Sequence, residues 1–236
     1  MTASRRFGLP WLIAAAAVPT VLWQLPYGQY ALAPFTVMAT WFHEMGHGLT
    51  ALLLGGRFDQ MLLYSDGSGL TSSGPAWGGR VGVALVSAGG LMGPPTAGFF
   101  FLLASTRAWS ARTAVFLLGG LMVFSSVVWI RTLYGCVAIS LIGLAFLLLA
   151  FRGSEEVRAL MAKLVGVQAC IASYRSRGYM FSSEANVGGH AIHSDTANMA
   201  KELFLPYWFW GGTLCLASLS LLVLGLYWST RPARER

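Results

Sequence analysis

The sequence predicts an all-α polytopic membrane protein, built as one bundle of six to seven transmembrane helices within a single domain, residues 1–236. Of the 236 residues, 56% are hydrophobic and only 11% are charged, and the mean hydropathy is +0.61. A soluble domain usually carries about twice that charged fraction. Helical spans satisfy every backbone polar group inside lipid, and this length leaves no room for a large soluble domain beside the bundle.

The net charge of +7 comes from basic residues that are scattered singly along the chain rather than gathered in one patch. Basic residues that flank apolar spans face the lipid head groups. We therefore expect these residues to interact with a lipid bilayer, and we expect no nucleic-acid partner. The three cysteines are an odd number without CxxC spacing, so the sequence indicates neither a disulfide framework nor a cysteine zinc site.

The N-terminal third of the chain predicts two spans and a hairpin. We interpret Leu9–Gln24 as an uncleaved first helix, because no convincing small-x-small cleavage site follows its apolar core. A second span covers Ala33–Leu54, with Pro34 placed for a first helical turn. The polar, glycine-rich stretch 55–79 follows this helix. Within it, two short strand patterns flank an Asp66-Gly67 turn, which predicts a small β-hairpin.

Three further spans follow this hairpin. The first covers Val81–Ala104 and contains Pro94-Pro95 near its middle, so we expect the prolines to kink or break the helix. The other two, Ala114–Ile130 and Leu133–Phe151, are joined with hardly any loop.

The C-terminal third is less uniform. Val157–Tyr174 is mostly apolar but carries two basic residues, so it is either a span buried in the bundle, which we favour, or an amphipathic surface helix. Residues 175–193 are polar and contain glycine, which predicts a loop. Ser194-Asp195 resembles a helix start, and Leu205–Trp228 is the last span.

A pentad of chemistry-bearing residues, His43-Glu44-Met45-Gly46-His47, lies inside the second predicted span. Two histidines four apart share one face of a helix, so both imidazoles can bind one zinc ion, and Glu44 is placed to activate a water held by the metal. Core histidines without metal are the alternative, but burying two imidazoles and a carboxylate unsatisfied is costly. The pattern favours one Zn²⁺ per chain.

A catalytic zinc ion wants three protein ligands and one open position, so a third ligand has to come from elsewhere. Asp195 is the favoured candidate, because it opens a helix before the last span and has His190, His193 and Asn198 nearby. Those three are candidates for contacting substrate or supporting the ligands. Asp195 as a plain helix-capping acid and Glu202 as the third ligand remain alternatives.

The ordered motifs of the chain resemble the site-2 protease-like intramembrane zinc metallopeptidase family, and within it the small B-like branch of bacteria and plants. The resemblance runs from about residue 35 to residue 210. It rests on these segments: His43-Glu44-Met45-Gly46-His47-Gly48, Ala51–Gly56, Asp66–Thr71, Ser87–Pro94 and Ser194-Asp195-Thr196-Ala197. It implies His43, His47 and Asp195 as zinc ligands and Glu44 as the general base. It also implies a multi-pass protein of a bacterial-type cytoplasmic membrane.

The chain departs from the family pattern at two places. It has no LDG motif, and Ala97 stands where the Gly-Pro-x-x-Asn motif would carry asparagine, so the substrate-clamping role of that asparagine is not carried over. We expect a polar cavity that leads water to the site and is lined by His43, Glu44, His47 and Asp195, with Pro94-Pro95 near it.

The predicted function is that of a zinc-dependent integral membrane endopeptidase, a HExxH metalloprotease that cleaves a membrane protein or peptide in or near the bilayer. Two rivals remain: a gluzincin-type membrane protease with a glutamate ligand, and a non-proteolytic metal-binding regulator or scaffold. The predicted hairpin either offers an edge strand to an extended substrate or serves only as a connection.

Overall fold

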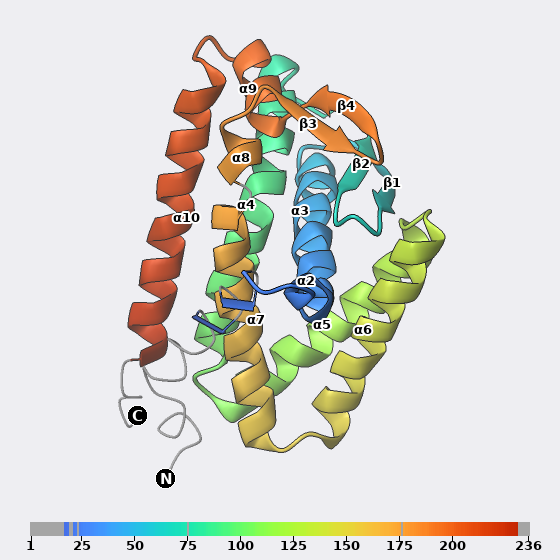
Figure 1. Ribbon diagram of the computed structural model, residues 1–236, viewed down its shortest axis with the longest axis vertical. Helices are drawn as coiled ribbons and strands as arrows, with labels where there is room; N and C mark the ends of the chain where they lie inside the picture. Colours follow the sequence, from blue (N-terminus) through green and yellow to red (C-terminus); the bar gives the residue numbers. More distant parts are fainter. Residues whose placement is uncertain (1–16, 19–20, 23, 75, 176, 231–236) are drawn as a thin grey trace.

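The computed structural model describes residues 17–18, 21–22, 24–74, 76–175 and 177–230. It is a helical bundle with two β-hairpins and one short helix gathered at the same end (Figure 1). Its helices are α2 (Gly28–Ala31), α3 (Ala33–Leu53), α4 (Arg80–Ala104), α5 (Ala108–Val128), α6 (Leu133–Arg152), α7 (Glu155–Arg175), α8 (Arg177–Met180), α9 (Asp195–Glu202) and α10 (Tyr207–Thr230). Its strands are β1 (Phe58–Leu63), β2 (Gly69–Ser73), β3 (Glu184–Val187) and β4 (His190–His193).

Four of the described helices are long and apolar enough to cross a membrane: α4, α5, α6 and α10. The predicted total of six to seven spans is therefore not confirmed. The helices α3 and α7 have 21 residues each and are long enough, but both carry charged or titratable side chains that lower their hydropathy. Most of the predicted first span, Leu9–Gln24, lies outside the described residues.

The helix α7 packs inside the bundle, against α4 and α5 (Figure 1). Its side chains Ala162, Val165 and Cys170 are fully buried, and even the polar residues Lys163 and Gln168 are less than 8% exposed. This burial agrees with the favoured interpretation of a helix within the bundle, and it contradicts the alternative of an amphipathic helix on the surface.

The helix α4 is continuous from Arg80 to Ala104, although Pro94 and Pro95 lie inside it. Of the two expected effects of these prolines, a kink or a break, the break is therefore absent. Each proline removes one backbone donor, but α4 packs against α3, α7 and α10, and this packing holds the helical path. One contact is direct, because the Cys170 thiol of α7 approaches the Pro95 carbonyl at 3.7 Å.

The predicted first hairpin is present, with β1 and β2 antiparallel around a turn in which Gly67 has a φ of +86°. The outer edge of β1 is occupied, because Met61 exchanges backbone hydrogen bonds with Trp129 (2.8 Å) and Arg131 (3.0 Å). Among the described residues, β2 makes backbone ladder bonds to β1 only. The free edge of this sheet is therefore β2.

A second hairpin, β3–β4, lies where the sequence predicted a loop over residues 175–193, so that prediction was wrong. The strands have only four residues each, which is too short to show a clear alternating pattern. The overlooked signal was Gly188-Gly189, a two-residue turn in which both φ angles are positive (+56° and +86°), as such hairpin turns require.

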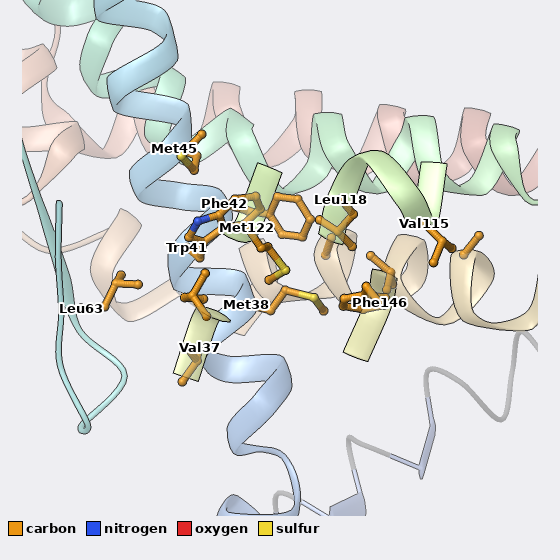
Figure 2. Packing of buried hydrophobic residues seen from close by; sticks show 14 of the residues in the cluster. Val37, Met38, Trp41, Phe42, Met45, Leu63, Val115, Leu118, Met122 and Phe146 are labelled. Atoms are coloured by element: carbon orange, nitrogen blue, oxygen red, sulfur yellow. The ribbon is translucent and has the colours of Figure 1, made fainter. Parts of the chain in front are cut away.

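The core fixes which way the pentad faces. Val37, Met38, Trp41 and Phe42 of α3 pack against residues of α5 and α6, among them Met122 (Figure 2). The Trp41 indole donates a 2.9 Å hydrogen bond to the Ser125 hydroxyl of α5. Since this face of α3 is committed to the core, the face that carries the two histidines is turned toward α4 and the hairpins.

Candidate metal centre

The pentad histidines lie one turn apart on α3, and their Nε2 atoms face each other at 3.1 Å. Both rings are largely buried, with the His43 side chain 20% exposed and the His47 side chain 13% exposed. Two imidazole nitrogens at this distance need a proton or a cation between them, because two lone pairs repel.

Asp195 supplies an oxygen to this pair from the first turn of α9. Its Oδ2 lies 3.1 Å from His43 Nε2 and 3.4 Å from His47 Nε2. The N-cap of α9 is Ser194, whose hydroxyl accepts a hydrogen bond from the Ala197 amide at 3.2 Å. Capping is therefore done by Ser194, and the Asp195 side chain is directed at the imidazoles.

Burial opposes the ionised form of Asp195, but the electrostatic attraction of the two facing imidazoles outweighs it and holds the pKa of Asp195 below its usual value. The carboxylate is therefore ionised in this setting. Its Oδ2 is the buried side-chain atom that lacks a hydrogen-bond partner within the described chain. An orphaned buried anionic oxygen is costly, and a bound cation would satisfy it.

The three donor atoms fit a zinc ion. Atoms that each lie about 2.0–2.2 Å from a tetrahedral zinc ion are about 3.3 Å apart. The observed separations are 3.1, 3.1 and 3.4 Å. Two imidazole nitrogens and one carboxylate oxygen are also a donor set that zinc accepts, leaving a fourth position open. Within the described chain, His43, His47 and Asp195 form a cluster able to hold a metal ion.

The helix α4 orients the His47 ring through its Nδ1 atom, on the side away from the cluster. His47 Nδ1 lies 2.8 Å from the Val86 carbonyl, which can only accept, so Nδ1–H donates and Nε2 of the neutral ring presents its lone pair to the cluster. Gly90 of α4 faces the same ring, and an added Cβ there would lie 2.1 Å from His47 Nε2. The absence of a side chain at Gly90 therefore makes room for the imidazole.

Glu44 is 4% exposed and lies between the histidines and the first hairpin. Its carbonyl accepts a hydrogen bond from the Thr71 hydroxyl of β2 at 3.0 Å. Its carboxylate borders Gly69, where an added Cβ would lie 2.7 Å from Glu44 Oε1. The carboxylate is thus held close beside the free strand β2.

A cavity of about 470 Å³ opens in front of this site. His43, Glu44 and Pro94 line it, together with residues 67–69 of the first hairpin and 184–187 of the second. Pro94 borders the cavity as expected, but only His43 and Glu44 of the four expected lining residues do so. His47 and Asp195 are not among its lining residues, so the cavity reaches the cluster from the His43–Glu44 side.

Tyr179 of α8 is a residue of the site that the sequence did not indicate. Its hydroxyl accepts a hydrogen bond from the Asp195 amide at 3.2 Å, and its ring lies edge-on to His43 with centroids 6.0 Å apart. Burial, and then the Asp195 charge, raise the pKa of Tyr179, so the phenol keeps its proton. No sequence pattern marks this tyrosine, because it lies in the stretch predicted as a loop.

The remaining candidates lie away from the cluster. His190 and His193 are exposed on β4, and Asn198 lies on α9 without lining the cavity. Glu202 is engaged elsewhere, since its Oε2 lies 3.2 Å from Arg80 Nε at the N-terminus of α4. None of these four belongs to the group of possible metal ligands found among the described residues.

The fold and this cluster together define a helical membrane protein with a HExxH pentad and a candidate mononuclear metal site. A family model described as Peptidase M50B-like matches residues 11–225. The chain therefore belongs to this family, a site-2 protease family of zinc metalloproteases, and the resemblance inferred from its motifs is confirmed. Neither a curated protein nor a solved structure matches the chain.

Proposed function

We propose that this protein is a zinc-dependent integral membrane endopeptidase that hydrolyses peptide bonds in or near the bilayer. The observation that carries the proposal is the near-equilateral triangle formed by His43 Nε2, His47 Nε2 and the orphaned Asp195 Oδ2. Family membership supports the same activity. A bacterial-type cytoplasmic membrane as its location rests on the resemblance to the small B-like branch.

His43, His47 and Asp195 would hold one Zn²⁺ per chain. When bound, the ion would supply a Lewis acid that activates water and polarises the scissile carbonyl. Glu44 is the base that takes a proton from the water and hands it to the leaving amine. Its burial between α3 and β2 keeps the carboxylate in reach of the cavity, and the His47–Val86 hydrogen bond keeps the imidazole tautomer correct for ligation.

The substrate we propose is a membrane protein or peptide bound in extended form along β2. The opposite edge of the sheet, on β1, is already paired with Trp129 and Arg131, whereas β2 borders the cavity through Gly69. An extended chain added to β2 would pass Glu44 with its backbone held open, and a helical substrate must be opened before its carbonyl can react.

The test combines metal content with cleavage. We expect about one zinc per wild-type chain and much less for His47→Ala and Asp195→Asn. Glu44→Gln should keep its zinc and cut a fluorogenic transmembrane peptide in micelles at least about 100-fold more slowly. His193→Ala, an exposed histidine on β4, is the matched control and should change neither quantity.

Two results would overturn the proposal. If His47→Ala retained wild-type zinc, the ion would not be held by this cluster. If Glu44→Gln kept zinc and still performed the cellular role of the protein, a non-proteolytic regulator or scaffold would be the better description. The gluzincin alternative draws no support from Glu202, because that carboxylate pairs with Arg80.

A further inference from the structure

Tyr179 is held rigidly against the first turn of α9. The Thr196 hydroxyl donates to the Met180 carbonyl at 3.0 Å, and the Ser194 hydroxyl donates to the Ser182 carbonyl at 2.5 Å. These bonds fasten the segment that carries Tyr179 to the two residues on either side of Asp195. The phenol and the carboxylate therefore keep a fixed relation to each other.

The Tyr179 hydroxyl contacts Asp195 at its backbone, where it accepts the hydrogen bond of the Asp195 amide at 3.2 Å. Asp195 lies in the first turn of α9, where amides have no partner within the helix, so the phenol oxygen satisfies one of these donors. The phenol thus holds the backbone from which the Asp195 side chain extends toward the imidazoles.

The other two members of the cluster have their own restraints. Both histidines belong to the same turn region of the well-packed helix α3, and His47 is fixed further by the Val86 carbonyl. Asp195 comes from the short helix α9, at the other side of the site, and its Oδ2 has no hydrogen-bond partner of its own. Carboxylate ligands that lack such support are poorly oriented, and outer partners commonly decide metal affinity.

We propose that Tyr179 is a positioning residue for the metal site, whose hydroxyl holds the Asp195 backbone amide so that Oδ2 is directed at the Nε2 atoms of His43 and His47. This role rests on the proposed function, since it presumes that Asp195 is a zinc ligand. The residue acts through Asp195 and takes no proton itself. Its ring contact with His43 is separate from its hydroxyl contact with Asp195.

The test is Tyr179→Phe, which keeps the ring against His43 and removes only the oxygen. We expect the zinc dissociation constant, measured by chelator competition on the full chain, to rise about 10- to 100-fold. With Co²⁺ in place of zinc, the visible d–d bands should shift, because one ligand is no longer held in the same geometry. A purely structural role would leave those bands unchanged.

Tyr64→Phe is the matched control, because the Tyr64 ring packs under Gly188 at the tips of the two hairpins, away from Asp195. It should leave both zinc affinity and the cobalt bands as in the wild type. Three results would overturn the inference: a zinc affinity of Tyr179→Phe within threefold of wild type, unchanged cobalt bands, or an equal loss in Tyr64→Phe. If the wild-type chain itself bound no zinc, the proposed function would fall with it.

Discussion

Gly90 offers a direct test of the candidate site, because the position faces His47 and has no room for a side chain. An added Cβ would lie 2.1 Å from His47 Nε2 and 2.2 Å from its Cε1. Non-bonded carbon atoms normally stay about 3.5 Å apart, so the imidazole or α4 must move by more than about 1 Å. Zinc–ligand distances tolerate only about 0.2 Å, so Gly90→Ala should displace a ligand entirely.

The expected result is a zinc affinity at least about 100-fold below wild type, since the loss of an outer partner alone costs about 10- to 100-fold. Overpacking should also cost about 1–3 kcal/mol of stability, partly offset by the better helix propensity of alanine, about 1 kcal/mol. The assay is chelator competition, together with zinc stoichiometry on protein whose helical circular dichroism matches the wild type.

Gly120→Ala on α5 is the control, because an added Cβ there would meet nothing within 4 Å. The same substitution should therefore leave zinc affinity unchanged and stability equal or slightly higher. A folded Gly90→Ala that binds zinc within threefold of wild type would refute the reasoning, because His47 could not then occupy the position that the structure gives it.

Three further outcomes are expected. Glu202→Gln breaks an ion pair with the largely exposed Arg80, so it should cost no more than about 1 kcal/mol and leave zinc stoichiometry unchanged; zinc loss would revive the glutamate-ligand alternative. Hydrogen bonds from Ser68 lower the pKa of Asp66 below its ordinary value. The ionised carboxylate therefore stabilises the turn at pH values above the pKa that Asp66 has in the unfolded chain. That small contribution is lost as the pH falls through the folded pKa, and Asp66→Asn should lessen the acid destabilisation measured in thermal melts between about pH 5 and pH 2.5. Removing zinc with a chelator should lower the melting temperature, and restoring zinc should reverse the loss; a melting temperature indifferent to zinc would argue against a built metal site.

Local pattern was sufficient for most helices and for the first hairpin. The predicted spans Ala114–Ile130 and Leu133–Phe151 correspond to α5 and α6, because an apolar run bounded by polar residues has few other ways to satisfy its backbone. The Asp66-Gly67 turn likewise indicated β1–β2 through its own turn chemistry.

What the sequence could not supply depends on tertiary contacts. The unbroken path of α4 through Pro94-Pro95 is held by neighbouring helices, so the helix propensity of the segment alone cannot decide whether the prolines break it. The position of Tyr179 against Asp195 follows from how α8 is fastened to α9, and neither residue type nor spacing reveals it. His43 and His47 could be predicted as a pair from the sequence, because one helical turn already brings them together.

The small residues between α3 and α4 explain how the backbone of α4 can come close enough to contact His47. A Cβ on Gly46 would lie 2.2 Å from the Gly89 carbonyl oxygen, and one on Gly93 would lie 2.4 Å from a carbonyl oxygen of α3. The two backbones therefore touch directly, as small residues allow in membrane helices. Only at this separation can the Val86 carbonyl of α4 reach His47 Nδ1 at 2.8 Å. The pattern Gly89-x-x-x-Gly93 thus serves helix packing and, through that packing, sets the orientation of a proposed metal ligand.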